Sequence, residues 1–189
     1  MKTRSVLILL CMVCFGWFCR SCNPAQTYPE IPEIHFKKLV FEDRWDTLSQ
    51  KFNNKPVLTF SFIDGDGDLG VRPQEIKPDG TYFPGGGISR IYYTWFQKNA
   101  DQTYEPYQFI NGATTSSKIP YEDVMDKSEA QNKTLKGIIE IELSKPGNLS
   151  GIDTMRIEFY IFDRAGNQSN TEYTPDFSIF SEPGAEITK

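Results

Sequence analysis

The chain has 189 residues, of which 24% are charged and 14% aromatic, and this length leaves room for one domain with a substantial core. Its formal net charge is −5 at pH 7, and loss of Lys2, Arg4 and Arg20 with an N-terminal leader would lower it to −8. Such an acidic body argues against nucleic-acid binding, which needs a basic face to neutralise phosphates, and favours cations or neutral polymers as partners.

The N-terminal residues predict an exported, membrane-anchored protein. Lys2 and Arg4 precede an almost wholly apolar run over residues 5–18, which is typical of a secretory signal peptide and is short for a membrane-spanning helix. Cys22 follows the small residue Ser21 after this run, where bacterial lipoproteins are cleaved and lipidated. Residues 1–21 are therefore interpreted as a lipoprotein signal peptide and Cys22 as the lipidation site. Ordinary soluble secretion with cleavage nearby is the alternative.

The four cysteines all lie within the first 22 residues, so the body of the chain contains no disulfide and depends on its hydrophobic core for stability. Residues 22–33 carry three prolines and lack apolar periodicity, which predicts a lipidated cysteine followed by an extended tether. The remaining chain is divided into a folded domain over residues 34–182 and a C-terminal tail over residues 183–189.

Strand-like alternation of apolar and polar residues runs through the whole body of the chain. The best helical segments, residues 42–52 and 121–131, are short. Short alternating strands without long intervening helices predict an all-β domain, a single antiparallel β-sandwich of about seven strands with an immunoglobulin-like arrangement. The expected strands span residues 34–41, 56–63, 89–96, 104–109, 135–144, 155–163 and 176–180.

One expected strand, residues 89–96, is rich in aromatic residues. Its alternation places Ile91, Tyr93 and Trp95 toward the core, and Tyr92 and Phe96 on the opposite face. With two tyrosines from the following strand, the outward rings would form a surface for stacking against a glycan or a protein partner. The alternative is that other parts of the chain cover this face. The candidate binding surface comprises Tyr92, Phe96, Tyr104 and Tyr107.

The stretch "DGDGDLG" (residues 64–70) ends an expected strand with three aspartates in alternate positions. In a sandwich of this type, the loop that it begins and the later loop "DRAGNQSN" (residues 163–170) emerge at the same end. Side-chain oxygens from both loops could bind Ca²⁺, which takes six to eight oxygen ligands. An EF-hand is rejected, because Leu69 stands where that motif requires glycine. The candidate metal ligands are Asp64, Asp66, Asp68, Asp163 and Asn167.

A second interpretation of "DGDGDLG" needs no metal. Aspartate and glycine are common in turns, where an aspartate accepts hydrogen bonds from nearby backbone amides and glycine adopts positive φ. The sequence alone leaves open whether this stretch is a stable turn or a weak calcium site.

The residues that usually perform catalysis are scarce, so no catalytic residue is assigned. His35 is the only histidine, and every cysteine lies in the N-terminal leader region. This composition disfavours zinc sites and nucleophilic triads, and a hydrolase acting on glycans through paired carboxylates is the least favoured alternative. We therefore expect a non-enzymatic binding or accessory module, or alternatively a structural subunit of an envelope complex.

Cys22, "FSFIDGDGDLG", "LKGIIEIEL" and "YIFDRAGNQSN" together resemble a group of uncharacterised envelope lipoproteins from Bacteroides-type Gram-negative bacteria. The resemblance covers about residues 55–180 and implies an immunoglobulin-like sandwich anchored in the outer membrane, with no established activity. The segment "NPAQ" after Cys22 lacks the acidic residues of surface-exposed members, which implies the periplasmic face. Asp46-Thr47-Leu48 and Asp153-Thr154-Met155 also resemble the O-glycosylation signal of these bacteria.

Overall fold

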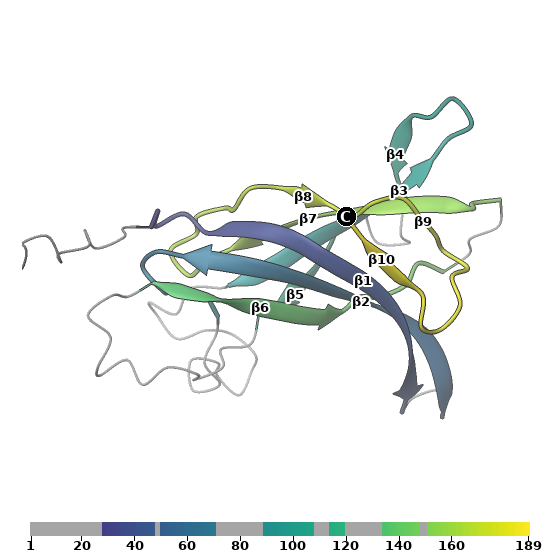
Figure 1. Cartoon of the computed structure of the whole chain (residues 1–189), viewed down its shortest axis with the longest axis horizontal. Coiled ribbons are helices and arrows are strands. Elements are labelled where there is room, and N and C mark those ends of the chain that lie inside the picture. The colour runs from purple at the N-terminus through teal and green to yellow at the C-terminus, as the bar shows by residue number, and fades with distance from the viewer. Residues whose placement is uncertain (1–27, 48–49, 71–88, 108–113, 120–133, 148–150) are drawn as a thin grey trace, which may run out of the picture.

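The computed structural model describes residues 28–47, 50–70, 89–107, 114–119, 134–147 and 151–189. Within these ranges the chain forms strands and no helix, so none of the described residues belongs to a helix that could span a membrane (Figure 1). The strands are β1 (Glu33–Asp46), β2 (Lys51–Asp64), β3 (Arg90–Lys98), β4 (Tyr104–Pro106), β5 (Thr114–Lys118), β6 (Leu135–Glu142), β7 (Thr154–Phe162), β8 (Glu172–Tyr173), β9 (Phe177–Ser178) and β10 (Glu186–Thr188).

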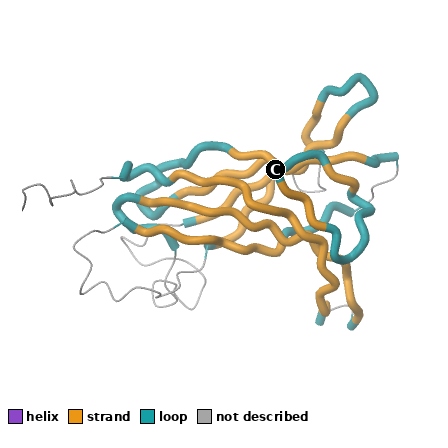
Figure 2. The backbone as a smooth tube through the Cα atoms, viewed as in Figure 1, coloured by secondary structure: helices purple, strands orange, loops and turns teal. Residues whose placement is uncertain are grey.

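The strands form two antiparallel sheets that pack face to face (Figures 1 and 2). The first sheet has the order β10-β1-β2-β6. The second has the order β4-β3-β7-β8, with β5 also paired to β3 and β9 also paired to β7. The predicted antiparallel β-sandwich is therefore confirmed.

The core lies between the two sheets and is built from the alternation seen in the sequence. Along β7 every second residue is buried, from Met155 to Ile161. Phe60 of the first sheet contacts Phe159 of the second, with ring centroids 5.4 Å apart, which joins the two sheets at the centre of the core. Trp95 is fully buried against the ring of Phe177, as expected for a core aromatic residue.

The structure corrects several predicted boundaries. The first helical candidate, residues 42–52, is wrong where it is described, because residues 42–46 belong to β1 and residues 51–52 to β2, with Trp45 and Phe52 paired across the strands. β10 pairs with β1 inside the segment predicted to be a tail, so the domain continues past residue 182. β5 and β8 were also not predicted. The second helical candidate, residues 121–131, the signal peptide and Cys22 lie outside the described residues.

The direction of the strands decides which loops meet at each end of the sandwich. β2 ends at Asp64 and β7 ends at Phe162, and the loops that follow these strands emerge together. The turn between β1 and β2 and the start of β7 lie at the opposite end. The two loops that carry the candidate metal ligands therefore share one end of the domain, as predicted.

Candidate functional site

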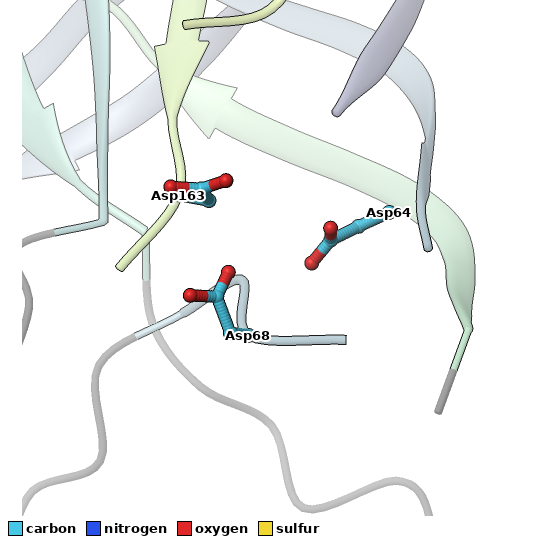
Figure 3. A group of neighbouring side chains, drawn as sticks. All are labelled: Asp64, Asp68 and Asp163. Atoms are coloured by element: carbon cyan, nitrogen blue, oxygen red, sulfur yellow. The ribbon is translucent and has the colours of Figure 1, made fainter. Parts of the chain in front are cut away.

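Three aspartates converge at this end of the sandwich, and we call them the acidic cluster: Asp64, Asp68 and Asp163. Asp64 is the last residue of β2, Asp68 lies four residues later, and Asp163 directly follows β7. One carboxylate oxygen from each lies within 4.8 Å of the others, and Figure 3 shows the three carboxylates turned toward one another. Oxygens that bind one Ca²⁺ at 2.3–2.6 Å lie at most about 5 Å apart, so this spacing fits a common ion.

The glycines of the loop and two backbone hydrogen bonds hold the acidic cluster in place. Gly67 and Gly70 have φ angles of 67° and 97°, which side-chain-bearing residues rarely adopt. The loop then turns Leu69 into the core, and its N–H donates to Asp64 Oδ2 at 2.9 Å. The Arg164 N–H donates to Asp68 Oδ1 at 3.4 Å, which joins the two loops.

Two of the three carboxylates are removed from solvent. Asp64 is 0% exposed and Asp163 is 1% exposed. Among the residues that the structure describes, Oδ1 of Asp64 has no hydrogen-bond partner of fixed position, and neither has the buried Oδ1 of the neighbouring Asp66. A hydrogen bond between these two carboxyls requires a proton on one of them, because two ionised carboxylates cannot donate to each other, and ionising both leaves buried charge without a partner. A buried acceptor in this state is what a cation would satisfy.

This environment changes the acidity of the cluster. Burial, together with hydrogen bonding and repulsion from Asp66, raises the pKa of Asp64 from 3.8 to about 7, although the Leu69 N–H opposes this rise. Burial and the charges of Asp163 and Asp66 also raise the pKa of Asp68. Both shifts mean that the folded protein binds protons at this end more tightly than an unfolded chain does.

Asn167, the fifth predicted ligand, supports Asp163. Its backbone N–H donates to Asp163 Oδ1 at 2.7 Å, and its side-chain amide donates to Oδ2 at 2.8 Å. Asp163 therefore combines the role expected of a turn residue with a position in the acidic cluster. Of the five predicted ligands, the structure brings Asp64, Asp68 and Asp163 together. Asp66 lies beside Asp64, and Asn167 orients Asp163 through its hydrogen bonds.

The predicted binding surface lies on the outer face of the second sheet, which we call the aromatic face. Tyr92 stacks on Tyr160 of β7, with centroids 5.5 Å apart and an interplanar angle of 10°, and Phe162 packs edge-on against both rings. Alternation puts Phe96 on the same face as Tyr92, opposite the core, as predicted, and both residues are partly buried. The aromatic face comprises Tyr92, Phe96, Tyr104, Arg156, Tyr160, Phe162 and Tyr173.

At the other end of this face, near the start of β7, the Arg156 side chain lies among aromatic rings. The Arg156 guanidinium lies 3.6 Å from the Tyr104 centroid and 4.8 Å from that of Tyr173. This arrangement combines cation–π attraction with burial of the arginine side chain. Tyr107 is different, because it packs against the hydrophobic core and donates its N–H to the Trp95 carbonyl. Three of the four predicted surface residues therefore share this face.

Sequence reasoning missed two residues at the acidic end. Gly65 lies against the chain at Tyr28 and Pro29, and Asn170 hydrogen-bonds both backbone polar groups of Ile34. The run of glycines in "DGDGDLG" is a signal for close backbone approach, but it does not identify the segment approached. His35 is half exposed, with Nε2 3.1 Å from Glu33, in keeping with its expected role as a strand residue.

No protein-family model, no curated protein and no solved structure matches this chain. The resemblance to envelope lipoproteins, the lipidation of Cys22 and the binding of calcium therefore stay predictions.

Proposed function

We propose that this chain is a non-enzymatic envelope lipoprotein whose immunoglobulin-like domain binds Ca²⁺ through Asp64, Asp68 and Asp163. The observation that carries the proposal is the fully buried Asp64, which has a carboxylate oxygen within 4.8 Å of oxygens of two other carboxylates and whose Oδ1 has no hydrogen-bond partner among the described residues. A divalent cation would relieve the repulsion among these groups and satisfy the open oxygen.

The chemistry of the ligands favours calcium over the transition metals. All three groups are carboxylates, which are hard oxygen ligands, whereas zinc and copper prefer histidine and cysteine. Calcium also tolerates irregular geometry and accepts backbone carbonyls and waters as its remaining ligands. A site with few protein ligands on an exported domain corresponds to a Kd of about 10⁻⁴ to 10⁻³ M.

Other features support the placement of the domain in the cell envelope. The charged and then apolar N-terminus and Cys22 predict a lipid anchor, and the tether would hold the domain near the periplasmic face of the outer membrane. The grouping of β1, β2 and β6 in one sheet and β3, β7 and β8 in the other is compatible with the immunoglobulin-like arrangement that we propose. A role as a structural subunit of an envelope complex is compatible with the same site.

Isothermal titration with calcium tests the proposal. We expect the wild-type chain to release or absorb heat with a saturating curve in the millimolar range, and Asp64→Asn and Asp163→Asn to abolish it. Asp153→Asn is the matched control, because Asp153 is an exposed carboxylate just before β7, at the strand end opposite Asp163. An absence of heat, together with an unchanged melting temperature at 5 mM calcium, would contradict the proposal.

A second function is suggested by the aromatic face, which we propose binds a neutral glycan or a protein partner. The near-parallel Tyr92–Tyr160 pair is the observation that favours it, since flat rings stack on sugar rings and anchor protein interfaces. Tyr92→Ala should weaken capture of the partner in a glycan array or pull-down. His35→Ala, on the first sheet, is the control that should leave capture unchanged.

A further inference from the structure

The loop that carries the acidic cluster also holds the N-terminal segment, residues 28–34. Gly65 lies between Asp64 and Asp68 in the sequence, and its N–H donates to the Pro29 carbonyl at 2.9 Å. A Cβ atom on Gly65 would lie 2.2 Å from Pro29 O and 2.5 Å from Tyr28 O. Glycine is therefore required here for the two stretches of backbone to touch.

Residues next to the loop add further contacts to the same segment. Lys136, near the start of β6, places Nζ 3.5 Å from the centroid of the Tyr28 ring. Thr134 donates its hydroxyl to the Gly65 carbonyl at 3.3 Å, so the loop and β6 hold the segment together. These contacts hold residues 28 and 29 against the loop and the start of β6.

The second loop of the acidic cluster holds the other end of the segment. Asn170, in the loop that begins with Asp163, accepts the Ile34 N–H at 2.8 Å and donates its amide to the Ile34 carbonyl at 2.9 Å. Both loops that supply carboxylates thus also grip the N-terminal segment. If the two loops move relative to each other, the hydrogen bonds from Gly65 to Pro29 or those between Asn170 and Ile34 must stretch or break.

We propose that calcium bound by Asp64, Asp68 and Asp163 closes a clasp on residues 28–34, the end of the predicted tether and the first two residues of β1. Without calcium, repulsion among the buried carboxylates drives the two loops apart and loosens the segment. With calcium, the loops are drawn together around the ion, and the segment is held against them. Calcium thereby determines whether the end of the tether, from residue 28, is held against the domain or released from it. This inference rests on the calcium site of the proposed function.

Thermodynamic linkage makes the coupling reciprocal. If calcium tightens the grip on the segment, then contacts to the segment must tighten calcium binding by the same factor. Lys136→Ala tests this point, because it removes the contact to Tyr28 without changing a carboxylate or the loop. Lys38→Ala, an exposed lysine paired with Glu186 on the far side of β1, is the matched control.

The experiment is hydrogen exchange, read by mass spectrometry, on the full-length chain in detergent with EGTA or with 5 mM calcium. Isothermal titration calorimetry on the same samples measures calcium binding. We expect calcium to slow exchange in peptides covering residues 28–36 by roughly five- to tenfold, the usual range of allosteric coupling. Asp64→Asn should abolish this slowing. Lys136→Ala should reduce it and weaken calcium affinity by the same factor, and Lys38→Ala should change neither.

A second pair of variants tests the backbone contact itself. Gly65→Ala should release residues 28–36 even in calcium, whereas Gly147→Ala should not, because no atom of the described residues lies within 4 Å of a Cβ built at Gly147. If titration shows calcium binding while exchange at residues 28–36 stays the same, the clasp is overturned and the calcium site stands. If calcium does not bind at all, both proposals are overturned.

Discussion

Two carboxylates near opposite ends of the sandwich, Asp64 and Asp176, lie in opposite environments. Asp176 accepts hydrogen bonds from Lys98 Nζ and from the Tyr104 hydroxyl, both at 2.8 Å. Burial acts to raise its pKa, but these bonds lower it overall. Asp64 is buried beside two other acids, and its pKa is raised to about 7. The Lys98 ammonium therefore neutralises Asp176, whereas a cation that neutralises Asp64 would have to be a bound ion.

The comparison has a consequence for stability. Ionised Asp176 is stabilised in the folded state by Lys98 and Tyr104, so this end of the domain needs no ligand to neutralise its carboxylate. Ionised Asp64 raises the free energy of the folded state, because its charge is buried without a compensating partner on Oδ1. A bound cation would convert this unfavourable term into a favourable one. The acidic end is therefore where a ligand can change the stability of the domain most.

The largest expected effect comes from Asp64→Asn in the absence of metal. Asparagine keeps an oxygen to accept the Leu69 N–H but removes the buried charge. We expect the free energy of unfolding at pH 8 to rise by ~2 kcal/mol, which is below the full value of a three-unit pKa shift because the loop can relax. Urea denaturation in EGTA measures it. Asp153→Asn, the exposed control, should change stability little, and a destabilised Asp64→Asn protein would contradict this account of the cluster.

The next effect is a dependence of stability on pH. The folded pKa of Asp64 lies above its ordinary value, so the folded state holds a proton that the unfolded state has lost between about pH 4 and about pH 7. Stability of the metal-free protein should therefore fall as the pH rises through this window. Asp176 acts in the opposite sense, since its lowered pKa gives stability that is lost only as the pH falls below its ordinary value of 3.8.

Melting temperatures at pH 5 and pH 8, with and without calcium, separate these terms. At pH 8 we expect 5 mM calcium to add ~1–2 kcal/mol for a Kd of 10⁻⁴ to 10⁻³ M. At pH 5 the gain should be smaller, because calcium must displace the proton from Asp64. A calcium effect that is equal at both pH values would place the ion away from the acidic cluster.

The smallest effect belongs to Asp176→Asn. The pair with Lys98 is partly exposed to solvent, and such pairs contribute little to stability and are weakened by salt. We expect a slight loss of stability that disappears in 0.5 M sodium chloride, and an unchanged response to calcium. Chemical denaturation at two salt concentrations measures it, and a loss of calcium binding in this variant would break the contrast between the two ends.

The sequence predicts the parts of the fold that have a clear period. The alternation of Ile91, Tyr93 and Trp95 identifies both a strand and the face that it buries, because side chains on a strand alternate between faces. The meeting of the loops after β2 and β7 also follows from sandwich topology alone. Short strands such as β8 and β10 are not predicted, since two or three residues are too few to show a period.

The remaining errors have physical causes. Residues 42–46 continue β1 beyond the segment predicted as a strand, where charged residues on both faces hide the alternation. Within the acidic cluster, sequence spacing suggests three equivalent aspartates, but the turn at Gly67 directs Asp64 and Asp68 toward Asp163 and leaves Asp66 beside them. The contact between Gly65 and Pro29 joins distant parts of the chain, so no local sequence pattern predicts it.

The most direct test of the calcium site is a crystal structure of the domain grown in 5 mM calcium, with anomalous diffraction data. We predict an anomalous peak 2.3–2.6 Å from carboxylate oxygens of Asp64, Asp68 and Asp163, as calcium coordination requires. Well-ordered carboxylates at the same positions with no anomalous peak between them would contradict the central claim.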